Sequence, residues 1–154
     1  MKQTVTVIGC IVLCLFVGFT ASQFQMDAIK YWYPLLNKPP LTPPNLVFPV
    51  SWTLLYILMG IAGGLLINKR AAREQVVVKL FFLQLVFNFL WSLLFFYYQN
   101  PLLGLLDIVI LDIVVFVLIK QAYRYNKISF WLLVPYLLWI LFATYLNGSI
   151  VILN

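Results

Sequence analysis

Long apolar stretches alternate with short polar segments along the whole chain. Five of the stretches have the length of about 20 residues that a helix needs to cross the hydrocarbon core of a bilayer. They lie at about residues 4–25, 46–67, 79–98, 103–123 and 129–151. The pattern predicts an all-α membrane protein. We expect a bundle of five transmembrane helices in a single membrane domain, residues 1–154, with a long first loop at about residues 26–45 that acts as a lid.

Composition supports a membrane location. The chain is 64% hydrophobic and only 9% charged, with a mean hydropathy of +1.02. A soluble domain of 154 residues could not bury that much apolar surface. The sequence contains no histidine, which removes the commonest general base and metal ligand, and we predict no metal site. The net charge of +6 comes from residues between apolar runs rather than from a stripe, so we expect no nucleic-acid partner.

The first apolar run resembles a signal peptide, because Lys2 precedes an apolar core that ends in small residues. The run from Val5 to Ala21 is long for such a core, and we therefore predict a retained first membrane helix. Cys10 and Cys14 lie four residues apart in this run. We interpret them as small apolar side chains on one helix face, without a disulfide.

Lys and Arg are distributed unequally between the two ends of the predicted bundle. Lys30 and Lys38 fall at one end, and the other basic residues fall at the opposite end: Lys2, Lys69, Arg70, Arg73, Lys79, Lys120, Arg124 and Lys127. The positive-inside rule then predicts a cytoplasmic N-terminus, with the first loop and the C-terminus outside. This orientation assumes a bacterial cell membrane.

Polar and aromatic side chains at membrane depth indicate the interior of the bundle, because they are costly to expose to lipid. Three helices each carry a face that combines aromatic residues with small or polar ones. These faces are Phe48, Trp52, Tyr56 and Met59; Gln84, Asn88, Trp91 and Phe95; and Tyr136, Trp139, Ala143 and Asn147. Packing between helices would explain any one of them. Three together favour an aromatic-walled cavity on which a flat conjugated ligand would stack.

Three further features of the apolar runs leave alternatives open. Gly60 and Gly64 form a Gly-x-x-x-Gly pattern, whose partner helix lies either in this chain or in a second protomer. Asp107 and Asp112 lie five residues apart on one helix, so they face different directions and cannot form a catalytic pair. Asp112 is deeper in its run and is the better functional candidate, either neutral or bonded to a neighbouring helix.

The proline-rich segment NKPPLTPPNLVFPVSW, residues 37–52, joins the first two runs. Each proline fixes φ and lacks an N–H, so the segment loses less entropy on ordering. We predict a stiff lid across the mouth of the bundle that continues into the second helix, with Pro49 in the first turns.

Three motifs carry a resemblance to a known family. The stretch from Trp32 to Gly60, WYPLLNKPPLTPPNLVFPVSWTLLYILMG, resembles the first-loop and second-helix signature of the tryptophan-rich sensory protein family. The animal members of that family are the translocator protein, or peripheral benzodiazepine receptor. The stretches QLVFNFLWSLLFF, from Gln84, and PYLLWILFATYLN, from Pro135, resemble its third- and fifth-helix patterns. The motifs occur in the family's order over nearly the whole chain. The chain is identified as a bacterial-type member of the family.

The resemblance implies a ligand class and a site. Family members bind porphyrins, including protoporphyrin IX and haem, and synthetic isoquinoline-carboxamide and benzodiazepine-type ligands, and they are usually homodimers. No cofactor is required, and the porphyrin is a ligand or substrate. With Tyr56 from the face described above, the site residues that we expect are Tyr33, Pro43, Trp52, Tyr56, Asn88, Trp91, Trp139, Ala143 and Leu146. We expect a porphyrin to stack between Trp52 and Trp139, with Asn88 donating to its polar edge.

Three functions are consistent with that site. The first is a porphyrin-binding sensor. The second is an enzyme that degrades protoporphyrin in light and oxygen, with Trp52 and Trp139 as the candidate catalytic residues. The third is a transporter of porphyrins or other small hydrophobic ligands, against which the absence of internal repeats argues. Cholesterol is not expected as a partner, because the tail after Asn147 lacks the basic residue of the animal sterol motif.

Overall fold

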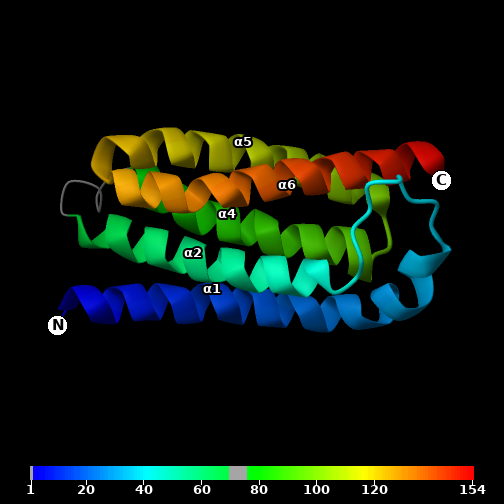
Figure 1. Ribbon diagram of the computed structural model, residues 1–154, viewed down its shortest axis with the longest axis horizontal. Coiled ribbons are helices and arrows are strands. Elements are labelled where there is room, and N and C mark those ends of the chain that lie inside the picture. Colours follow the sequence, from blue (N-terminus) through cyan, green and yellow to red (C-terminus); the bar gives the residue numbers. More distant parts are fainter. Residues whose placement is uncertain (1, 70–75) are drawn as a thin grey trace.

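The computed structural model describes residues 2–69 and 76–154. Five membrane-length helical segments run back and forth along one axis (Figure 1). The elements are α1 (Lys2–Asp27), η1 (Ala28–Trp32), η2 (Tyr33–Leu35), α2 (Val47–Asn68), α4 (Val76–Ser92), η3 (Leu93–Tyr97), α5 (Pro101–Tyr125) and α6 (Lys127–Leu153). The predicted all-α bundle of five transmembrane helices is confirmed, and the largest shift is at the end of the first span, expected at about residue 25 and observed at Leu35.

The helices close into a ring. α1 packs on α2, α2 on α6, α6 on α5, α5 on α4, and α4 returns to α1. The two termini lie at opposite ends of the bundle, as an odd number of spans requires (Figure 1). Arg70 and Arg73, which the orientation prediction counts, lie outside the described residues, and the orientation itself stays a prediction.

Asparagine side chains set two of the helix boundaries. Asn100 accepts a hydrogen bond from the backbone N–H of Leu103 and so caps α5, whose first residue is Pro101. At the end of α5 the backbone N–H of Asn126 donates to the carbonyl oxygen of Ala122. The side-chain oxygen of Asn126 accepts hydrogen bonds from the backbone N–H groups of residues 128 and 129 at the start of α6. These caps explain why the links on either side of α5 are short.

The predicted start of the first loop is wrong. The chain stays helical beyond residue 26, first as α1, then through the π turn η1 and the 3₁₀ turn η2 to Leu35. Lys38 stabilises this extension because its ammonium donates to the carbonyl oxygens of Tyr33, Pro34 and Leu36 at the helix end. The irregular segment is therefore confined to residues 36–46.

Glycines hold α1 close to α2. A Cβ atom on Gly60 would lie 2.4 Å from the Cα atom of Ile11, and one on Gly64 would lie 2.5 Å from the Cα atom of Val7. Both glycines face α1 of the same chain, so the Gly-x-x-x-Gly pattern is used within the protomer. Cys10 and Cys14 are buried free thiols, as expected from their spacing.

The acidic residues of α5 are separate, as predicted. Asp107 is buried. Asp112 accepts a hydrogen bond of 2.7 Å from the hydroxyl group of Thr144 on α6. Of the two alternatives for Asp112, a bond to a neighbouring helix is thus present, and it ties α5 to α6.

Candidate functional site: an aromatic cavity in the bundle

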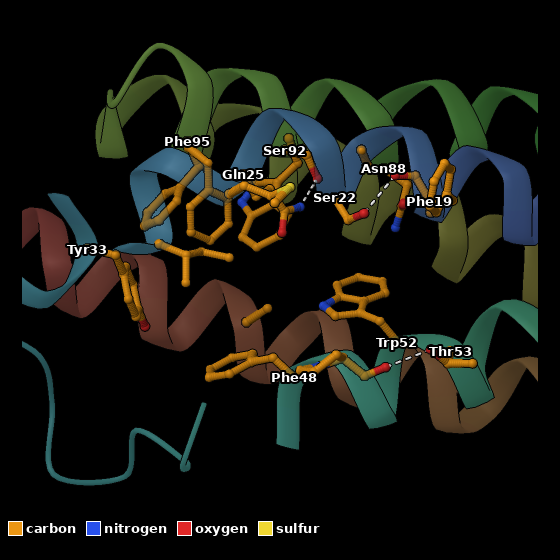
Figure 2. A pocket seen from close by; sticks show the side chains of 18 of the residues that line it. Phe19, Ser22, Gln25, Tyr33, Phe48, Trp52, Thr53, Asn88, Ser92 and Phe95 are labelled. Atoms are coloured by element: carbon orange, nitrogen blue, oxygen red, sulfur yellow. Dashed lines mark hydrogen bonds between the residues drawn. The ribbon is translucent and has the colours of Figure 1, made fainter. Parts of the chain in front are cut away.

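A cavity of about 660 Å³ lies inside the bundle, at the end where residues 36–46 connect α1 to α2. Its walls come from α1, α2, α4 with η3, and α6. Small-molecule sites in proteins have volumes of about 300–1,000 Å³, so the space is sufficient for a compact ligand. Figure 2 shows Phe48 and Trp52 on one side of the cavity and Gln25, Ser92 and Phe95 on the other.

The α2 wall is a stripe of aromatic rings. Phe48, Trp52 and Tyr56 recur every fourth residue, which places them on one face of the helix. The rings of Trp52 and Tyr56 are stacked, with centroids 5.6 Å apart. Pro49 lies in the first turns of α2, as predicted, so its missing N–H leaves no gap in the helix.

The α4 wall continues into the π turn η3. Trp91 and Phe95 stack with centroids 5.7 Å apart, and Phe95 contacts Phe96 edge to face at 4.8 Å. Both phenylalanines line the cavity although they are consecutive in the sequence. A π turn rotates the chain less per residue than an α-helix does, and such turns are frequent at functional sites. Residues Leu93–Tyr97 therefore add ring surface to the wall.

A buried chain of hydrogen bonds forms the inner end of the cavity. The Tyr56 hydroxyl donates to the amide oxygen of Asn88, and the Asn88 amide nitrogen donates to the Tyr136 hydroxyl at 3.2 Å. Tyr136 in turn donates to the amide oxygen of Gln84 at 2.9 Å. Asn88 is only 1% exposed. Both polar atoms of its side chain are thus engaged by the protein, which leaves one amide N–H for a ligand.

Three other hydrogen bonds hold the helices around the cavity together. The indole N–H of Trp91 donates to Asn147 at 3.2 Å, and the Asn147 amide donates to the carbonyl oxygen of Pro101 at 2.8 Å. On the opposite side, the Gln25 amide donates to the hydroxyl oxygen of Ser92 at 2.8 Å and so joins α1 to α4. These bonds join the walls and orient the Trp91 ring.

Seven of the expected site residues line this one cavity. They are Tyr33, Trp52, Tyr56, Asn88, Trp91, Ala143 and Leu146. The structure therefore brings together residues of η2, α2, α4 and α6 that are far apart in the sequence.

Trp139 and Pro43 are placed differently from the expectation, since neither lines the cavity. The rings of Trp52 and Trp139 have centroids 6.5 Å apart and planes at 88° to each other, so they meet edge to face. Rings in perpendicular contact leave no slot between them in this arrangement, and the stacking of a porphyrin between Trp52 and Trp139 stays a prediction. Trp139 contacts Phe48 as well, and thus supports the α2 wall from behind.

The proline segment contributes little to the lining. Of residues 36–46, Asn45 lines the cavity and Pro43 does not. The segment crosses from the end of α1 to the C-terminal end of α6 and then returns to α2 (Figure 1). Asn37 and Asn154 hold it there, because each donates to an oxygen of the other, at 3.0 and 3.1 Å.

The sequence reasoning missed the whole wall that α1 provides. Its lining residues include Gly18, Ala21, Ser22 and Gln25. These positions form a stripe of small and polar residues at helical spacing, in a run that is otherwise apolar. Such a stripe could have indicated a face of α1 that an aromatic ring approaches closely. In the structure, a Cβ atom on Gly18 would lie 2.3 Å from the ring of Tyr56.

The fold and the cavity together define a class: a multi-pass membrane protein with an aromatic-walled cavity between its helices. The TspO/MBR family model matches residues 10–153. The chain is 46% identical over 147 residues to the tryptophan-rich protein TspO of Archaeoglobus fulgidus, which covers 96% of this chain and 95% of that protein. The chain belongs to the TspO/MBR family.

Other relatives extend the comparison. Identity is 43% over 155 residues to the tryptophan-rich protein TspO of Chlorobaculum tepidum, covering 99% of this chain and 98% of that one. It is 33% over 134 residues to the translocator protein of Sus scrofa, covering 84% and 79% respectively. The resemblance found from the three sequence motifs is therefore confirmed.

Proposed function

We propose that the protein is a membrane receptor that holds a flat conjugated ligand of the porphyrin type in the cavity between α1, α2, α4 and α6. The observation that carries the proposal is the wall of stacked rings formed by Trp52, Tyr56, Trp91 and Phe95. Aromatic walls favour flat ligands, since offset stacking and burial of ring surface both stabilise the complex. Isoquinoline-carboxamide and benzodiazepine-type ligands are flat aromatic molecules that the same walls would accept.

Sensing, orientation and assembly belong to the same proposal. One relative, from Cereibacter sphaeroides, is named a tryptophan-rich sensory protein, and this name supports a sensory role. The distribution of basic residues supports a cytoplasmic N-terminus, with residues 36–46 and the C-terminus on the other side of a bacterial cell membrane. A homodimer would need a surface other than Gly60 and Gly64, because these two glycines already contact α1 of their own chain.

The test is a titration of the detergent-solubilised protein with protoporphyrin IX in the dark, followed by quenching of tryptophan fluorescence. Ala143 is 8% exposed and lines the cavity, so Ala143→Phe fills space that the ligand needs. We expect this variant to weaken binding by at least about tenfold, which corresponds to about 1.4 kcal/mol.

Leu138→Phe is the control, because Leu138 is on the same helix but 63% exposed on the lipid side. It is expected to bind as the unmodified protein does. Equal affinities of the unmodified protein and Ala143→Phe would show that the porphyrin binds elsewhere, and the proposed site would be rejected.

A further inference from the structure

A second, smaller hollow lies at the surface of the bundle, where the end of α1 meets the π turn η3. Its volume is about 260 Å³. Its exposed lining side chains are aromatic or polar: Gln23, Phe24, Asp27, Tyr97 and Gln99. Phe96 is the residue that lines both this hollow and the aromatic cavity. Sites for drug-sized molecules have volumes of about 300–1,000 Å³, so the hollow suits a smaller group than a conjugated ring system.

Three unusual backbone features meet at this hollow. Ala28 is the first residue of the π turn η1, and Phe96 and Tyr97 belong to the π turn η3; all three line the hollow. Gln99 has a φ angle of 50° and is the one described residue other than glycine with a positive φ. π turns are frequent at functional sites, and strained backbone conformations cluster at ligand sites. The backbone therefore indicates a binding site here rather than an ordinary connection between helices.

The hollow contains an unpaired carboxylate. Asp27 is exposed, and its side chain makes no hydrogen bond or ion pair with another residue that the structure describes. The two lysines at this end of the bundle do not neutralise it. The ammonium of Lys38 is held by backbone carbonyl oxygens of residues 33–36, and the ammonium of Lys30 lies 5.0 Å from the ring centre of Tyr31. The negative charge of Asp27 is therefore available to a cation from outside the protein.

The aromatic part of the lining also suits a cation. The rings of Phe24 and Tyr97 meet edge to face with centroids 5.6 Å apart, and both residues line the hollow beside Asp27. An alkylammonium group is attracted both to the face of an aromatic ring and to a carboxylate, and sites for quaternary ammonium ligands use aromatic side chains in this way. The lining thus has the chemistry that recognises a substituted amine.

The position of the hollow indicates where such an amine comes from. The third membrane-length segment ends at Tyr97 and the fourth begins at Pro101, so Gln99 lies in the turn between two spans, at the level of the lipid headgroups. Lys30 is exposed and follows Asp27 by three residues, so charges of both signs lie close together in the sequence. This pair complements a headgroup that carries an ammonium and a phosphate.

We propose that the hollow between α1 and η3 binds the headgroup of a phospholipid that carries an alkylammonium group, as phosphatidylcholine does. The ammonium pairs with Asp27 and lies against the rings of Phe24 and Tyr97, and the phosphate lies on the side of Lys30. The site is separate from the aromatic cavity, so the proposal goes beyond the proposed function and does not depend on it.

The test is native mass spectrometry of the delipidated protein in detergent, titrated separately with dioleoyl phosphatidylcholine and dioleoyl phosphatidylglycerol. Asp27→Asn removes the charge at an exposed position and keeps the shape of the side chain. We expect this variant to bind phosphatidylcholine at least about fivefold more weakly than the unmodified protein. Its binding of phosphatidylglycerol, which has no amine, should not weaken. Asp27→Glu keeps the charge and should retain most of the phosphatidylcholine affinity.

Tyr97→Leu and Tyr98→Leu form a matched pair, since both tyrosines are exposed and Tyr98 is not among the lining residues. Phosphatidylcholine should bind more weakly to Tyr97→Leu and equally well to Tyr98→Leu. An unchanged phosphatidylcholine affinity in Asp27→Asn would overturn the proposal. Equal weakening of both lipids in Asp27→Asn would overturn it too, because the loss would then be independent of the amine.

Soluble phosphocholine distinguishes a lipid site from a site for a free amine. We expect phosphocholine to leave the bound lipid in place, because it lacks the acyl chains that hold a headgroup at this depth. Displacement of phosphatidylcholine by phosphocholine, together with phosphocholine binding that is lost in Asp27→Asn, would make a small soluble molecule the occupant and would overturn the assignment to a lipid.

Discussion

Replacing Gly60 by alanine should push α1 away from α2. The added Cβ atom would lie 2.4 Å from the Cα atom and 2.7 Å from the backbone nitrogen of Ile11, against 3.4–4 Å for an ordinary contact. Backbone atoms cannot rotate aside as a side chain can, so the whole helix must move. Overpacking of this kind costs about 1–3 kcal/mol. Because α1 is a wall of the cavity, the movement should also weaken porphyrin binding.

Gly9→Ala is the matched control, since nothing lies within 4 Å of a Cβ atom at Gly9. Both substitutions gain the same helix propensity of about 1 kcal/mol, which cancels when the two variants are compared. The free energy of unfolding, measured by titration with a denaturing detergent, should be lower for Gly60→Ala than for Gly9→Ala by about 1–3 kcal/mol. Equal stabilities would refute the close approach of α1 and α2 within one chain.

The remaining predictions concern polar contacts. Tyr136→Phe removes the partner of Asn88 and Gln84 and should lower the unfolding free energy by about 1–3 kcal/mol, whereas Tyr123→Phe, at an exposed residue, should change it little. Thr144→Val leaves a carboxylate oxygen of Asp112 without its donor and should lower the unfolding free energy by about 1–3 kcal/mol in the same assay. Thr144→Ser keeps a hydroxyl donor and should retain the stability of the unmodified protein. Lys38→Met should speed proteolysis within residues 36–46 without changing global unfolding, and an unaltered cleavage rate would contradict its role in holding residues 33–36.

Much of the fold could be predicted because lipid imposes a simple rule on the sequence. A helix must satisfy its own backbone groups and present about 20 apolar residues to the bilayer, and each of the five spans does so. The same rule predicted which side chains face the interior of the bundle. Gln84 and Asn88 are polar residues in an apolar run, and both are buried in the structure. For Asp112 the sequence left two alternatives, a neutral carboxyl group or a bond to a neighbouring helix, and the structure shows a bond with Thr144.

The helical periodicity of the sequence could not predict which neighbouring element each helix face contacts. Trp139 shares a stripe with Tyr136 and Ala143, yet its ring turns against Trp52 and Phe48 rather than toward the cavity. The π turn η1 could not be foreseen either. Gln25, Asp27 and Lys30 are typical of a connection, and nothing local in the sequence signals that the helix continues past them to Leu35.

The residues of the α1 wall could not be assigned to the cavity from the sequence either. Its lining stripe of Gly18, Ala21 and Ser22 consists of small residues, which read as packing positions when the sequence is considered alone. In the structure they line the cavity, where Gly18 faces the ring of Tyr56.

A structure of the protein with bound protoporphyrin IX, determined in a lipid environment, tests the central claim most directly. The account predicts a ring inside the bundle, in contact with Trp52, Trp91 and Phe95. A ring bound on the lipid-facing surface or between two protomers, with the cavity still empty, would contradict it.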